Sequence, residues 1–129
     1  KIIHSEKCLN RVSAVIFIPK SRKRGNVRKL KTSSDVFEQA WNLAKKSDYW
    51  NAMILNGLAT STILSSEPKI IPKLIENGAL GASVSGNGPS IAAIVKNDNV
   101  SKIKSVFSSL EGKTTVAQIN NKKAEVYEL

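Results

Sequence analysis

The chain has 129 residues, of which 41% are hydrophobic and 23% charged, as is typical of one globular domain with a modest core. No apolar run approaches the roughly 18 residues needed to cross a bilayer, so the sequence predicts no membrane segment. The single Cys8 excludes an internal disulfide, and together with the single His4 it offers no zinc-ligand set. The net charge of +10 raises the possibility of an anionic partner.

The positive charge is concentrated in one stretch, where seven of the 20 basic residues fall between positions 20 and 31. Such a cluster could neutralise several phosphates, as nucleic-acid-binding proteins do. The stretch contains no aromatic residue on which a base could stack, so we favour a solvated connection. A small basic RNA-binding module remains an alternative function. The residues are Lys20, Arg22, Lys23, Arg24, Arg28, Lys29 and Lys31.

The first half of the chain predicts one strand followed by helices. Residues 12–18 are apolar and rich in β-branched side chains, and Pro19 closes the run, which predicts a buried strand. After the basic stretch, Asp35 and Glu38 form a pattern like a capping box, and apolar residues at helical spacing follow. We expect this helix to end near Ser47.

Two further helices are predicted before residue 79. Asp48 can cap the second, in which Gly57 costs roughly 1 kcal/mol relative to Ala. A glycine tolerated within a helix at that cost indicates close packing or a nearby ligand. The third helix is shorter, with Pro68 in its first turn and Gly78 as a left-handed C-terminal cap.

The second half predicts a β-hairpin, a helix and two final strands. The hairpin joins residues 79–85 and 90–95 through a tight turn over residues 86–89. This order of elements predicts an α+β fold with a two-layer arrangement, an antiparallel sheet with helices packed on one face, in a single domain over residues 1–129. The remaining elements are a helix that begins at Asp98 or Asn99 and ends at Gly112, and strands at 114–119 and 123–127.

The predicted hairpin turn is the most informative motif. Ser85, Gly86, Asn87 and Gly88 precede Pro89. Glycines there let the backbone approach a phosphate or another backbone, and consecutive free amides can form a small anion-binding nest. A plain hairpin turn is the alternative, because Gly-Asn-Gly is common turn chemistry.

Two familiar phosphate-binding motifs are absent from the sequence. The dinucleotide pattern Gly-x-Gly-x-x-Gly would need a third glycine where Ile91 stands, followed directly by a helix. A Walker loop at Gly112-Lys113-Thr114 would need an upstream glycine where Phe107 stands. The glycine motif therefore belongs to neither class.

The segment from Val84 to Ser90 resembles the third, C-terminal motif of the GHMP kinases. Together with the segment Asn56 to Ser61 and the strand end Ile16 to Pro19, it occurs in the order and spacing of archaeal-type shikimate kinases. The resemblance runs over nearly the whole chain. Because such kinases are longer, two-lobed proteins, it implies the ferredoxin-like C-terminal lobe, with the N-terminal ATP-binding lobe outside this chain.

The resemblance implies a cytoplasmic, ATP-dependent transferase that phosphorylates the 3-hydroxyl of shikimate in chorismate and aromatic amino-acid biosynthesis. ATP and Mg2+ would be bound mainly by the N-terminal lobe, which would also be the partner of this chain. Homoserine kinase is the nearest enzymatic alternative, because it shares the Ser-Gly-x-Gly-Pro loop. A membrane or nucleic-acid partner is not expected.

The site residues implied by the resemblance are few. Ser85, Gly86, Asn87 and Gly88 would lie beside the phosphate loop of the other lobe and close the active site by positioning, which phosphoryl transfer depends on. Asn56 is a candidate on the substrate side, although its amide could equally satisfy a neighbouring backbone group. No catalytic side chain and no metal ligand is assigned, and the chain alone is expected to be inactive because the resemblance places the phosphate loop and the acidic residues in the N-terminal lobe.

Overall fold

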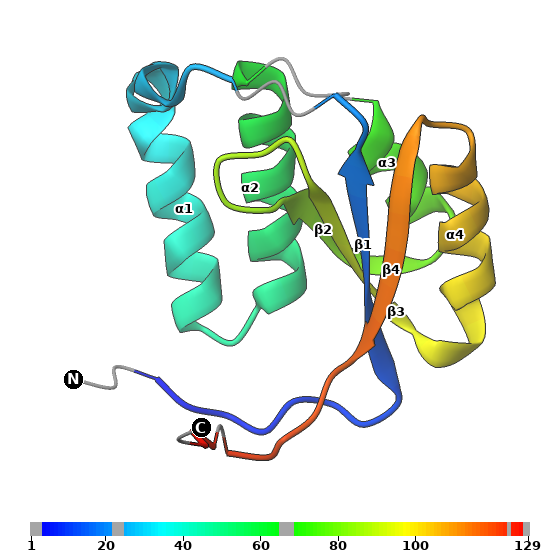
Figure 1. Ribbon diagram of the computed structural model, residues 1–129. Helices are drawn as coiled ribbons and strands as arrows, with labels where there is room; N and C mark the ends of the chain where they lie inside the picture. Colours follow the sequence, from blue (N-terminus) through cyan, green and yellow to red (C-terminus); the bar gives the residue numbers. More distant parts are fainter. Residues whose placement is uncertain (1–3, 22–24, 65–68, 124, 128–129) are drawn as a thin grey trace.

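The computed structural model describes residues 4–21, 25–64, 69–123 and 125–127. Its centre is a four-stranded antiparallel sheet with the strand order β2-β3-β1-β4 (Figure 1). The elements are β1 (Val12–Pro19), the 3-10 helix η1 (Val27–Ser33), α1 (Ser34–Lys45), α2 (Tyr49–Ile63), α3 (Ile70–Glu76), β2 (Ala79–Val84), β3 (Ile91–Lys96), the 3-10 helix η2 (Asn97–Asn99), α4 (Val100–Ser108) and β4 (Gly112–Gln118).

The sheet has the topology of a ferredoxin-like fold. Strand β1 lies between β3 and β4, so the connection from β1 to β2 passes over β3 and the connection from β3 to β4 passes over β1. In the central pair, Val15 lies opposite Ala93 and Phe17 opposite Ile91. The α+β class and the antiparallel sheet predicted from the sequence are therefore confirmed.

The main core lies between one face of the sheet and helices α3 and α4. On α4, Ile103 and Phe107 are one helical turn apart and both are fully buried. The ring of Phe107 stacks on that of Phe17, with centroids 5.1 Å apart and an interplanar angle of 9°. From α3, Ile71 and Leu74 complete the same cluster. Each such side chain contributes about 1.5–3 kcal/mol through burial.

Helix α2 packs against the edge strand β2, with α1 on its outer side (Figure 1). A Cβ atom on Gly57 would lie 2.3 Å from the Ala82 carbonyl oxygen and 2.8 Å from the Ser83 Cα, so helix and strand are in backbone contact. Next to it, Met53 packs on Gly81.

This packing changes the predicted layering of the helices. Gly81 and Ser83 alternate along β2 with Ala82, which belongs to the core on the opposite face. Helices α3 and α4 cover one face as expected, whereas the α1–α2 pair reaches β2 from the other side. The difference has a physical reason: small residues on both α2 and β2 allow a close approach that hydropathy patterns do not show.

The strand predicted at 123–127 is wrong. Residues 123 and 125–127, the described part of that range, lie in no strand. Both sides of β1 are already paired, with β3 and β4, and the segment buries no apolar surface, since Val126 is 93% exposed and Tyr127 is 80% exposed. The described part of this segment does not join either edge strand of the sheet, β2 or β4.

The remaining local predictions have mixed outcomes. Gly78 has a φ of +95° after α3, as predicted for a left-handed cap. Pro68 lies outside the described residues. The basic stretch is not all loop, because η1 forms within it and the side chain of Asn26 accepts a hydrogen bond from the Arg28 amide. Positions 22–24 of that stretch lie outside the described residues.

Replacing Gly57 with Ala tests the contact between α2 and β2. Alanine favours an isolated helix by roughly 1 kcal/mol, but the added methyl would press on backbone atoms of β2. We expect a net loss of about 1–3 kcal/mol in the free energy of urea unfolding. The exposed neighbour Leu58→Ala is the control and should change it much less. An increase in stability for Gly57→Ala would contradict the packing described above.

Candidate functional site

The loop between β2 and β3, residues 85–90, is called the glycine loop below. Its base is closed by the Ser85 amide, which donates to the Ser90 carbonyl at 2.7 Å. Within it, the Gly88 amide donates to the Ser85 carbonyl at 3.1 Å. Gly86 and Gly88 have φ angles of +57° and +69°, a region that side-chain-bearing residues rarely adopt. The predicted turn and its need for glycine are both confirmed.

The tip of the glycine loop presents its backbone to solvent. Ser85, Gly86 and Asn87 are exposed, and the amides of Gly86 and Asn87 have no acceptor among the described residues. A Cβ atom on Gly86 would meet nothing within 4 Å, whereas one on Gly88 would lie 3.2 Å from Val84 Cγ1. The loop therefore offers two free N–H donors with open space beside them, as an anion or a facing backbone requires.

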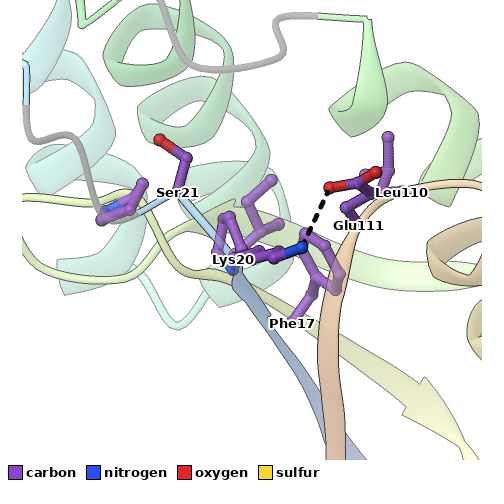
Figure 2. Close-up of a pocket in the computed structure, with 8 residues that line it drawn as sticks. Phe17, Lys20, Ser21, Leu110 and Glu111 are labelled. Atoms are coloured by element: carbon purple, nitrogen blue, oxygen red, sulfur yellow. Dashed lines mark ion pairs between the residues drawn. The ribbon is translucent and has the colours of Figure 1, made fainter.

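A cleft of about 500 Å³ adjoins the glycine loop at Pro89 (Figure 2). Phe17 and Leu110 lie on its apolar side. At its mouth, Lys20 Nζ points toward Glu111 and lies 4.0 Å from Oε2, with both side chains more than 80% exposed. An ion pair so exposed is worth little, so the lysine charge remains available to solvent and ligands.

The sequence did not predict this cleft. It depends on the turn before β4 meeting the end of β1, where the Lys20 amide donates to the Glu111 carbonyl at 3.0 Å. These two residues are far apart in the chain, and no local pattern connects them.

Asn56 lies on α2 and contacts β2. Its Nδ2 donates to Ser83 Oγ at 3.0 Å, and Ser83 Oγ donates in turn to the Val84 carbonyl at 3.2 Å. Ser83 is buried, whereas Asn56 is half-buried. The sequence alternatives for Asn56 were a substrate contact or a neighbouring backbone group. Its partner in the structure is a serine side chain, and sequence analysis did not single out that serine.

Residues 68–111 match the family model described as GHMP kinases C terminal. A shikimate kinase of Methanosarcina mazei is 36% identical to the chain over 129 residues, covering 96% of the chain and 43% of the relative. A shikimate kinase of Methanosarcina acetivorans is 39% identical over 101 residues, covering 77% of the chain and 34% of the relative. The chain carries the C-terminal domain of the GHMP kinase family.

Solved structures agree on the fold of this GHMP domain. A homoserine kinase from Cytophaga hutchinsonii superposes with a TM-score of 0.59 at 17% identity, over 87% of the chain and 43% of that structure. A putative homoserine kinase from Listeria monocytogenes gives 0.58 at 18% identity, over 92% of the chain and 45% of that structure. The chain thus spans less than half the length of the relatives that it matches.

The described residues of the GHMP domain contain no metal-binding group of three or more His, Cys, Asp or Glu side chains. They do not fit a Mg2+ site, and we assign them no metal-dependent step. The hydroxyls of Ser61 and Thr62 on α2 are engaged within the helix, since both donate to the Leu58 carbonyl. No helix in the described ranges has the length and apolar character to cross a membrane.

A second polar cluster ties the N-terminal segment to the turn between α1 and α2. The Tyr49 hydroxyl donates to Glu6 Oε2 at 2.7 Å and Ser47 Oγ donates to Oε1 at 3.0 Å. His4 Nε2 contacts the same tyrosine hydroxyl, a structural role that the sequence did not predict. The bonds from Tyr49 and then Ser47 lower the pKa of Glu6 below its ordinary 4.5.

Removing the tyrosine hydroxyl should raise the pKa of Glu6. The ionised carboxylate of Glu6 is the form that accepts these hydrogen bonds. Their contribution to stability is therefore fully present above pH 4.5 and is lost as the pH falls through the lower pKa of Glu6 in the folded protein. We expect Tyr49→Phe to move the NMR titration midpoint of the Glu6 carboxyl upward. Tyr127→Phe is a matched control, since Tyr127 bonds Glu125 instead. An unchanged midpoint in Tyr49→Phe would show that the bond is absent in solution.

Proposed function

We propose that the complete protein containing this domain transfers the γ-phosphoryl group of ATP to the 3-hydroxyl of shikimate. The observation that carries the proposal is the similarity to relatives named shikimate kinase, at 36% and 39% identity over most of the chain. The glycine motif lies within the aligned domain and forms the exposed loop described above. A net charge of +10 favours anionic ligands such as ATP.

The proposed role of the chain is positional. Phosphoryl transfer depends on aligning the acceptor oxygen with the γ-phosphate and on stabilising the charge that is transferred. In this proposal, Ser85, Gly86, Asn87 and Gly88 lie against the phosphate loop of an N-terminal lobe. The free amides of Gly86 and Asn87 supply hydrogen-bond donors there. ATP and Mg2+ are bound mainly by that lobe, which is also the partner of this chain.

Homoserine kinase is the second candidate function. Both solved structures, with TM-scores of 0.59 and 0.58, are homoserine kinases in name. Their identities of 17% and 18% support the shared fold alone. Shikimate is favoured because the sequence similarity to the archaeal shikimate kinases is about twice as high.

RNA binding receives less support from the structure. The four strands contain one aromatic residue, Phe17, and it is buried against Phe107. RNA-binding sheets stack bases on exposed aromatic side chains, and the strands of this sheet have no exposed aromatic side chain on which a base could stack.

A coupled ADP-release assay tests the proposed activity. The complete protein should turn over ATP when shikimate is added and should show little turnover with homoserine. The 129-residue chain alone should show background activity, because the ATP-binding lobe lies outside it. A preference for homoserine would make the protein a homoserine kinase, and turnover by the chain alone would place the active site within these residues.

Replacing Gly86 with Asn tests whether the glycine loop faces another lobe. Asn tolerates positive φ, and a Cβ atom at this position has no neighbouring atom within 4 Å. The thermal midpoint of the chain alone should therefore change little, while kcat of the complete protein falls about ten-fold or more, equivalent to ~1.4 kcal/mol. Gly78→Asn is the control at another positive φ, where the added Cβ would contact the Asn99 side chain 3.0 Å away, and it should keep kcat. Unchanged kcat in Gly86→Asn would contradict the facing arrangement.

A further inference from the structure

A hydrogen-bonded relay connects α2 with the start of the glycine loop. It begins at Asn56 Nδ2, passes through Ser83 Oγ and ends at the carbonyl of Val84, with donor–acceptor distances of 3.0 and 3.2 Å. Val84 is the last residue of β2, and Ser85 is the first residue of the loop. The relay therefore acts on the peptide unit that leads into the loop.

The relay starts from a fixed point on the helix. Gly57, the residue after Asn56, is in contact with the backbone of Ala82 and Ser83, so α2 cannot move toward β2 without a clash or away from it without opening that contact. Ser83 is 5% exposed, and a hydroxyl so buried depends on protein partners for its hydrogen bonds.

The side chain of Val84 also lies beside the second glycine of the loop. Val84 is buried, and its Cγ1 lies where a Cβ on Gly88 would be 3.2 Å away. Val84 therefore limits the room for a side chain at position 88, next to the peptide on which the relay acts.

We propose that Asn56 is a positioning residue that acts through Ser83 to hold the glycine loop in its active conformation. The proposal rests on the proposed kinase function, and it replaces a direct contact between Asn56 and the acceptor. Asn56 sets the orientation of Ser83, Ser83 holds the Val84 peptide, and the loop amides point in a fixed direction when a phosphate arrives. Preorganisation of this kind supports turnover rather than substrate affinity.

The first test measures the loop without any substrate. In the 129-residue chain, Asn56→Ala and Ser83→Ala should each shift the amide NMR signals of Gly86 and Gly88. The matched control is Asn51→Ala, because Asn51 is on the same helix and its Nδ2 donates to Asp48 Oδ2 at 3.0 Å, away from the loop. Loop signals that stay unchanged in both relay variants would overturn the proposal.

The second test measures kinetics in the complete protein. Each relay variant should lower kcat by about five-fold or more, with the KM for shikimate changed less than about two-fold. The double variant should be no slower than the slower single variant, because both substitutions break one relay. The control Asn51→Ala should keep kcat.

Other kinetic outcomes would overturn the proposal. A raised KM for shikimate in Asn56→Ala, with Ser83→Ala unaffected, would place Asn56 against the acceptor. Multiplying losses in the double variant would show two independent roles. A lowered thermal midpoint with unchanged kcat would show a role in folding alone. If the wild-type protein does not use shikimate, the proposed function fails, while the loop signals still decide whether the relay positions the loop.

Discussion

The backbone contact between α2 and β2 at Gly57 is the constraint on which the rest of the site depends. A side chain at this position would overlap the Ala82 carbonyl and move the helix outward. The Asn56–Ser83 bond, worth about 0.5–1.5 kcal/mol in net stability, would then be lost, and Met53 would leave Gly81. The helical cost of one glycine, roughly 1 kcal/mol, is thus offset by contacts that a closely packed helix can make.

The elements that sequence analysis predicted well are those with local signals. The runs at 12–18, 79–85 and 90–95 match β1, β2 and β3 to within about two residues. Each of these runs is rich in strand-forming residues and is bounded by turn-forming residues, so its ends can be read locally. The strand at 123–127 failed because strand propensity depends on burial and on packing against neighbouring strands, and Val126 and Tyr127 remain 93% and 80% exposed. The place of α1 and α2 was missed for a related reason, since it depends on small residues that meet across 25 positions in the chain, Gly57 and Ala82.

The candidate site also contains residues that local sequence patterns predict and residues that they do not. Gly86 and Gly88 were predictable because a tight Gly-Asn-Gly turn calls for positive φ, and both glycines adopt it. Ser83 and the cleft beside Lys20 were not predictable, since each becomes part of the site through a residue distant in sequence. The assignment of the loop to a phosphate loop in another lobe came from resemblance and remains a proposal.

In the proposed function, the contribution of this domain follows from what it offers chemically. Its loop presents amides rather than titrating side chains, so its effect depends on direction and distance, not on protonation. Glycine has more backbone freedom to lose than any other residue, and a loop with two glycines within four residues would sample many conformations if its own two hydrogen bonds alone held it. Strand pairing fixes the base of the hairpin, and the contacts from α2 fix the peptide that enters the loop. In the proposed kinase, the precision that phosphoryl transfer requires therefore comes from packing outside the loop, and this is the role that we propose for Asn56 on the face of α2 that meets β2.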